Sequence, residues 1–105
     1  MAKFMLVYLG GEQPSNPEEG KKHFEEYREW LMSLGDAVIS AANPLKDTHV
    51  ISSDGKANAG SSTLMSGFTV LEANSIEAAL LMSESCPFLK IGGTLEVSEL
   101  IEMNM

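Results

Sequence analysis

The stretch that decides the fold runs from Thr63 to Ile101 and reads TLMSGFTVLEANSIEAALLMSESCPFLKIGGTLEVSELI. Its first part is apolar on both alternating sets of positions, which is typical of a central strand with both faces covered. A helical segment follows, and Pro87 prevents that helix from continuing because proline lacks a backbone N–H and its ring clashes with the preceding turn. We therefore expect a strand at 64–71, a helix at 75–85, a break at Cys86-Pro87 and a closing strand at 94–101.

The first part of the chain has the same strand–helix pattern. Residues 3–9 are again apolar on both alternating sets, which predicts a second central strand. A helix should run from Pro17 or Glu18 to Leu34, with Asn16 as the N-cap and Gly35 as the C-terminal stop. Its apolar side chains share one arc at helical spacing, so the helix should pack on a sheet. The arc contains His23, Phe24, Tyr27, Trp30, Leu31 and Leu34.

The segment between the two units predicts short strands and turns. Residues 37–41 should form a strand that Asn43-Pro44 closes, and residues 49–52 a third, shorter strand. Asp54-Gly55 is a typical two-residue hairpin turn, and residues 56–62 are expected to be a mobile connector. Asn74 and Glu77 resemble a capping box at the start of the second helix.

The order of these elements is a duplicated βαβ unit with one extra short hairpin strand. It predicts an α+β domain of the ferredoxin-like βαββαβ type, with an antiparallel sheet and two helices on one of its faces. The other sheet face would expose a large apolar patch, and the chain has no third helix to cover it. We therefore expect a symmetric homodimer in which two sheets pack face to face.

Composition restricts the partners and the location. The 105 residues fit one domain, and the net charge of −8 argues against nucleic acid or an anionic membrane as a partner. No apolar run is long enough to span a bilayer. The chain has a single cysteine and hence no internal disulfide, so we expect a cytoplasmic protein.

Several short motifs, in their order and spacing, resemble the YCII-related (DGPF-type) family over nearly the whole chain. They are residues 3–8 (KFMLVY), Trp30 and Met32 before Gly35, 42–45 (ANPL), 54–56 (DGK), 75–79 (SIEAA), Cys86-Pro87 and 92–97 (GGTLEV). The resemblance implies a dimeric α/β barrel. Relatives in the wider superfamily include small-molecule isomerases, dehydrochlorinases and monooxygenases, and many have no assigned activity.

The resemblance also implies a role for one histidine. In the YciI-like branch a histidine of the first helix is proposed to work with an aspartate as an acid–base pair, and His23 matches that histidine. The chain departs from the family at three places. The Asp-Gly-Pro-Phe signature is replaced by residues 58–62 (NAGSS), and the aspartate motif of the branch reads Cys86-Pro87-Phe88. The closing Glu-Val-Arg-Pro of the family reads Glu96-Val97-Ser98-Glu99.

His23 is the best single candidate for catalysis, because an imidazole beside a pocket exchanges protons around neutral pH. The alternative is a boundary histidine with a structural hydrogen bond. Tyr27 and Trp30, together with Tyr8 and Ser66, are the expected lining of a ligand pocket between helix and sheet, although aromatic residues at helical spacing are more often part of the core.

Other polar residues have weaker indications. Glu72 and Glu96 are carboxylates that could pair with His23 across the sheet. Cys86 follows a helix C-terminus, the wrong end to lower a thiol pKa, so a structural role is expected. The two histidines lack neighbouring ligands at metal spacing, and we expect no metal and no cofactor.

The sequence leaves two classes of function open. The first is a cofactor-independent small-molecule enzyme with His23 as acid and base in an isomerase-type or lyase-type proton transfer. The second is a non-catalytic dimeric domain that binds a small organic ligand, or a scaffold whose pocket is filled by its own side chains.

Overall fold

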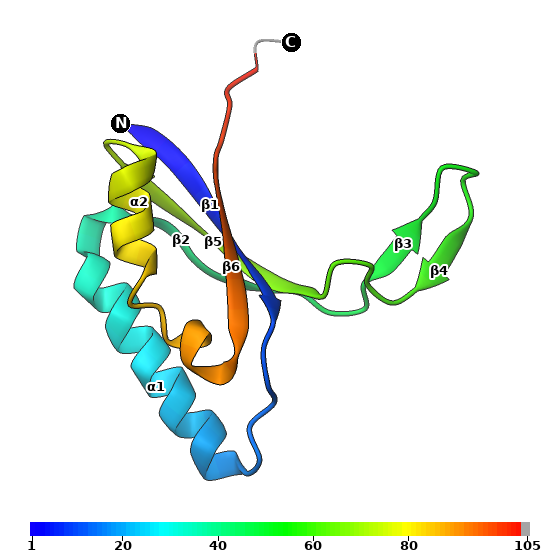
Figure 1. Ribbon diagram of the computed structural model, residues 1–105, viewed down its shortest axis with the longest axis horizontal. Coiled ribbons are helices and arrows are strands. Elements are labelled where there is room, and N and C mark those ends of the chain that lie inside the picture. The colour runs from blue at the N-terminus through cyan, green and yellow to red at the C-terminus, as the bar shows by residue number, and fades with distance from the viewer. Residues whose placement is uncertain (104–105) are drawn as a thin grey trace.

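The computed structural model describes residues 1–103 and has an α+β fold in which helices lie against an antiparallel sheet (Figure 1). The main sheet has four strands in the order β2-β5-β1-β6, and β3 pairs with β4 in a separate two-stranded sheet. The elements are β1 (Ala2–Gly10), α1 (Pro17–Leu34), the 3₁₀ turn η1 (Gly35–Ala37), β2 (Val38–Pro44), β3 (His49–Ile51), β4 (Ala57–Ala59), β5 (Met65–Ala73), α2 (Ile76–Ser83), the 3₁₀ turn η2 (Pro87–Ile91) and β6 (Gly93–Glu99). The predicted α+β class is confirmed.

The core lies between the helices and one face of the sheet. β1 pairs antiparallel with β5 on one side and with β6 on the other, so it is a central strand, as its apolar pattern predicts. Phe4, Leu6 and Tyr8 alternate along one face of β1 and are buried. Trp30 of α1 packs in a cluster with Leu6 and Tyr8, and Ala79 of α2 packs with Phe4. Both helices therefore cover the same face.

The opposite face of the sheet is uncovered within residues 1–103. Met5 lies opposite Val70, and Val7 lies opposite Phe68, so these four side chains share this face. All four are only half-buried.

The first helix forms as its sequence predicts. Asn16 accepts a hydrogen bond from the Glu19 N–H at 2.8 Å, Pro17 is the first helical residue, and the chain leaves the helix at Gly35 with a φ of +56°. The apolar arc has one exception, because Phe24 is 63% exposed. Neither helix of the described chain has the length and apolar character needed to cross a membrane.

The second helix begins with a different cap from the expected one. The side chain of Ser75, not Asn74, accepts the N–H of Ala78 at 3.1 Å. Glu77 then lies one residue too early to reach back to the cap in a capping box, which requires the third helical position. The helix ends at Ser83, and Pro87 begins η2 as a new turn.

An arm made of β3 and β4 extends away from the main sheet (Figure 1). Residues 57–59 pair with β3, so the prediction of a mobile connector over 56–62 is wrong for these residues. The turn also differs from the predicted one, because the Gly55 N–H donates to Ser52 O at 2.8 Å, which centres the turn on Ser53 and Asp54. Gly55, with a φ of +83°, follows it.

Candidate functional site

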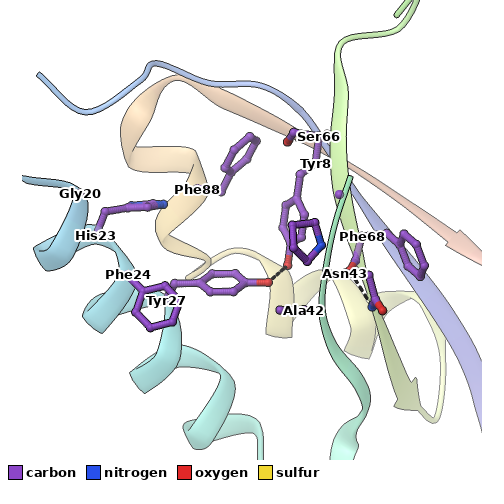
Figure 2. A pocket seen from close by; sticks show the side chains of 12 residues that line it. Tyr8, Gly20, His23, Phe24, Tyr27, Ala42, Asn43, Ser66, Phe68 and Phe88 are labelled. Carbon is purple, nitrogen blue, oxygen red and sulfur yellow. Dashed lines mark hydrogen bonds between the residues drawn. The ribbon is translucent and has the colours of Figure 1, made fainter. Parts of the chain in front are cut away.

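A cavity of about 330 Å³ lies between the N-terminal half of α1 and the sheet (Figure 2). It is bordered by the end of β1, the end of β2, the start of β5 and the turn η2. The lining residues are Tyr8, Gly20, His23, Phe24, Tyr27, Ala42, Asn43, Pro44, Ser66, Gly67, Phe68 and Phe88. The volume is at the lower end of the range of small-molecule sites, and the lining is mostly apolar, as such sites usually are.

The structure brings four of the five predicted site residues to this cavity. Tyr8, His23, Tyr27 and Ser66 line it, although they come from β1, α1 and β5. Trp30 does not line it. Its indole is 5% exposed, and its Nε1–H donates to Met82 O at 3.0 Å, so Trp30 belongs to the core between the two helices.

The hydroxyl groups of Tyr8, Tyr27 and Thr69 form a hydrogen-bonded network at one wall of the cavity. Tyr8 Oη lies 2.7 Å from Tyr27 Oη and 2.5 Å from Thr69 Oγ1. Tyr27 Oη is 3.0 Å from the same Thr69 oxygen, which donates to Ala41 O at 2.6 Å. Burial raises the pKa of Tyr8 well above that of a free tyrosine, so its hydroxyl remains protonated.

His23 points into the cavity from the helix side. It is half-buried, and Figure 2 shows its ring directed toward Phe88. Within residues 1–103 its ring nitrogens have no hydrogen-bond partner and no ion pair. Tyr27 follows His23 by four residues on α1, so the two side chains lie on the same helix face, roughly 6 Å apart along the axis.

The structure separates His23 from both predicted carboxylate partners. Glu96 lies opposite Val7, and Glu72 alternates with Phe68 along β5, which places both carboxylates on the uncovered face. The helices cover the other face, so the sheet lies between these groups and His23. Among helix carboxylates, Glu26 forms an ion pair with Lys90 at 3.1 Å, which lowers the pKa of the Glu26 carboxyl.

Phe88 is a lining residue that sequence reasoning missed, and two glycines make room for its ring. A Cβ added at Gly93 would lie 2.2 Å from the Phe88 ring, and one at Gly11 would lie 2.9 Å from it. Tyr8 packs against Phe88 edge to face, with ring centroids 5.2 Å apart. The available signal was the pair Gly92-Gly93 placed shortly after Phe88, because glycine leaves room for a neighbouring ring.

The lining of the cavity has few ionisable side chains. Within the described chain, its lining contains no Asp, Glu, Lys or Arg. Over the same residues, no cluster of three His, Cys, Asp or Glu side chains could hold a metal ion. Burial raises the pKa of the Cys86 thiol to about 11, so this free cysteine is a poor nucleophile at neutral pH.

Comparison of the sequence with known proteins returns no matching family model and no matching curated protein. The geometry of the cavity therefore carries the functional argument. Its features are a small volume, an aromatic and neutral lining, one histidine, and a network of hydroxyls. This arrangement suits a small, largely apolar molecule with a polar group placed near His23 and Tyr27.

Proposed function

We propose that this chain is a cofactor-independent small-molecule enzyme of the YCII-related (DGPF-type) kind, in which His23 transfers a proton on a ligand held in the cavity. The observation that carries the proposal is the placement of His23 and Tyr27 on the same cavity, whose lining is otherwise neutral and mostly apolar. A histidine in such a place is a suitable general acid and base.

An isomerase-type reaction fits these groups without any oxidant or reductant. His23 would accept a proton from a carbon of the substrate and return it to another carbon of the same molecule. The net charge and the oxidation state of the substrate therefore stay the same. The apolar walls would exclude water from the intermediate, and hydroxyl groups would hold the polar end of the substrate. A lyase-type reaction would begin with the same proton removal and continue with loss of a leaving group.

The fold and assembly proposed with this function are a ferredoxin-like domain and a dimeric α/β barrel. The strand order β2-β5-β1-β6, with both helices on one face, supports the first. The apolar side chains of Met5, Val7, Phe68 and Val70 on the uncovered face support a homodimer. A cytoplasmic location is proposed with it, because the single cysteine is a free thiol.

The alternative proposal is a domain that binds a small ligand without turning it over. One observation favours it: within residues 1–103, no side chain orients the His23 ring by a hydrogen bond. Catalytic histidines usually have one nitrogen fixed by a partner. In this alternative, His23 contributes a polar contact to the ligand and nothing more.

Solvent-deuterium exchange distinguishes the two proposals. Small unsaturated ketones and lactones that carry a hydroxyl group would be incubated with the protein in D₂O, and mass spectrometry would record deuterium bound to carbon. We expect incorporation with the wild type and with His49→Gln, whose histidine lies on the exposed arm, and loss of incorporation with His23→Gln. Equal incorporation with His23→Gln would contradict the catalytic role. Binding of a compound without any incorporation would favour the alternative.

A further inference from the structure

The hydrogen bonds around Ala41 O fix the direction of the protons in the hydroxyl network. Thr69 Oγ1 lies 2.6 Å from this carbonyl oxygen. A carbonyl only accepts, and two oxygens this close repel unless a proton lies between them, so Thr69 donates its single proton to Ala41 O. Thr69 is fully buried and therefore has no water to exchange with.

The hydroxyl protons of Tyr8 and Tyr27 can then be arranged in only one way along the short contacts. Because Thr69 has already used its proton, the 2.5 Å contact with Tyr8 requires that Tyr8 donates to Thr69. Tyr8 in turn has no proton left, so Tyr27 donates to Tyr8 across 2.7 Å, a much shorter contact than the 3.4 Å between Tyr27 Oη and Ala41 O. The chain of donors is Tyr27 to Tyr8, Tyr8 to Thr69, and Thr69 to the Ala41 carbonyl.

This direction makes the Tyr27 oxygen the open end of the network. Its proton is engaged, and within residues 1–103 no group donates to it. Tyr27 is half-buried and lines the cavity, whereas Thr69 does not line it and Tyr8 is almost fully buried. The free lone pairs of Tyr27 Oη are thus an acceptor that the network offers to a ligand.

From this geometry we infer that the cavity takes a neutral hydroxyl-bearing aromatic compound, a phenol or a benzylic alcohol, whose O–H donates to Tyr27 Oη. The inference rests on the proposed function in requiring that the cavity holds a small molecule. A cationic ligand is disfavoured because the lining has no Asp or Glu to compensate a buried positive charge. A phenolate is disfavoured because it has no proton to donate to Tyr27 Oη.

The shape and chemistry of the walls favour an aromatic body for this ligand. Tyr8 already lies edge to face with Tyr27 and with Phe88, at centroid separations of 5.9 and 5.2 Å. A further ring between these walls would extend the same packing. The volume of about 330 Å³ suits a compound of one or two rings.

Three probes of nearly equal shape test the inference, with dissociation constants measured by amide NMR titration. Para-cresol carries a hydroxyl that donates and accepts, para-methylanisole carries an oxygen that only accepts, and para-xylene carries neither. We expect para-cresol to bind roughly fivefold or more tightly than either of the others, the factor that corresponds to a net hydrogen bond of about 1 kcal/mol.

Two phenylalanine variants provide the matched control. Tyr27→Phe removes the acceptor, so the preference for para-cresol should disappear. Tyr8→Phe also deletes one hydroxyl of the network, but Tyr27 can then donate to Thr69 across 3.0 Å and remains an acceptor, so the preference should persist. Both variants keep their rings, and amide spectra report whether each is folded.

The possible failures are distinguishable. If para-methylanisole binds as tightly as para-cresol, or if Tyr27→Phe retains the preference, the inferred acceptor role is overturned while the cavity remains a binding site. If none of the three probes shifts the resonances of the cavity lining, the cavity does not bind molecules of this kind, and the inference falls together with the pocket on which the proposed function depends.

Discussion

The indole Nε1–H of Trp30 in α1 donates to the carbonyl oxygen of Met82 in α2 at 3.0 Å, and this hydrogen bond joins the two helices. Trp30 is nearly fully buried, and Met82 lies in the last turn of α2, where carbonyl groups lack helical partners. This contact explains why Trp30 belongs to the core, whereas Tyr27, one turn away on the same helix, reaches the cavity.

Replacing Trp30 with Phe should lower the stability of the domain. The change removes the donor to Met82 O and leaves a space beside it, so we expect a loss of about 1–3 kcal/mol in the free energy of unfolding. Urea denaturation measures this. Met32→Ala on the exposed side of α1 is the control and should change stability by less than about 0.5 kcal/mol. Equal effects of the two changes would contradict the assignment of Trp30 to the core.

Gly93→Ala should displace the Phe88 ring. The new methyl group would lie 2.2 Å from the ring, so we expect destabilisation by about 1–3 kcal/mol and altered amide shifts around the cavity. The double variant with Phe88→Leu tests the cause, because a smaller side chain relieves the clash. Gly93→Ala should therefore be less destabilising in the Phe88→Leu background. Strict additivity of the two changes would show that the contact is not the cause.

The buried thiol of Cys86 should make stability fall at alkaline pH. Its pKa is raised from 9.0 to about 11 by burial, so the unfolded chain loses this proton before the folded chain does. The contribution is fully present below pH 9.0, and it is lost as the pH rises from there toward about 11. Urea denaturation across this range should show a steeper fall for the wild type than for Cys86→Ala. Parallel curves would contradict the burial of the thiol.

A charge on the uncovered sheet face should prevent the proposed dimer. Val7→Lys places an ammonium group among Phe68 and its neighbours, where face-to-face packing would bury it. Light scattering should give twice 11.3 kDa for the wild type and 11.3 kDa for the variant. Leu81→Lys on the exposed side of α2 is the control and should remain a dimer. A monomeric wild type, or a dimeric Val7→Lys, would contradict the face-to-face assembly.

Much of the fold could be predicted because local signals and tertiary packing agree. In α1, the cap at Asn16, the apolar arc and the stop at Gly35 all favour the same helix, and the structure has it with the predicted bounds. Where two local signals compete, sequence alone is less decisive. Asn74 and Ser75 are both good caps, and the backbone selects Ser75 by its extended conformation.

The candidate site was harder to predict because both central strands are apolar on both faces. Such strands do not reveal which alternating set of residues faces the helices, so Glu72 could be taken as a partner of His23 although it lies on the uncovered face. Thr69 was missed for a related reason. A single threonine in an apolar strand gives no indication of its hydrogen bonds with Tyr8 and the Ala41 carbonyl, which depend on the packing of three separate elements.

The most direct measurement for the central claim is an amide NMR titration with para-cresol of the wild type and of Ala42→Trp. Ala42 lines the cavity but is exposed, so its replacement should fill the cavity and spare the core. We predict that the probe shifts the resonances of Tyr8, His23 and Ser66 in the wild type, and that these shifts vanish in Ala42→Trp. Shifts that persist in Ala42→Trp, or that gather on the arm or the uncovered sheet face, would contradict the account of this cavity as the functional site.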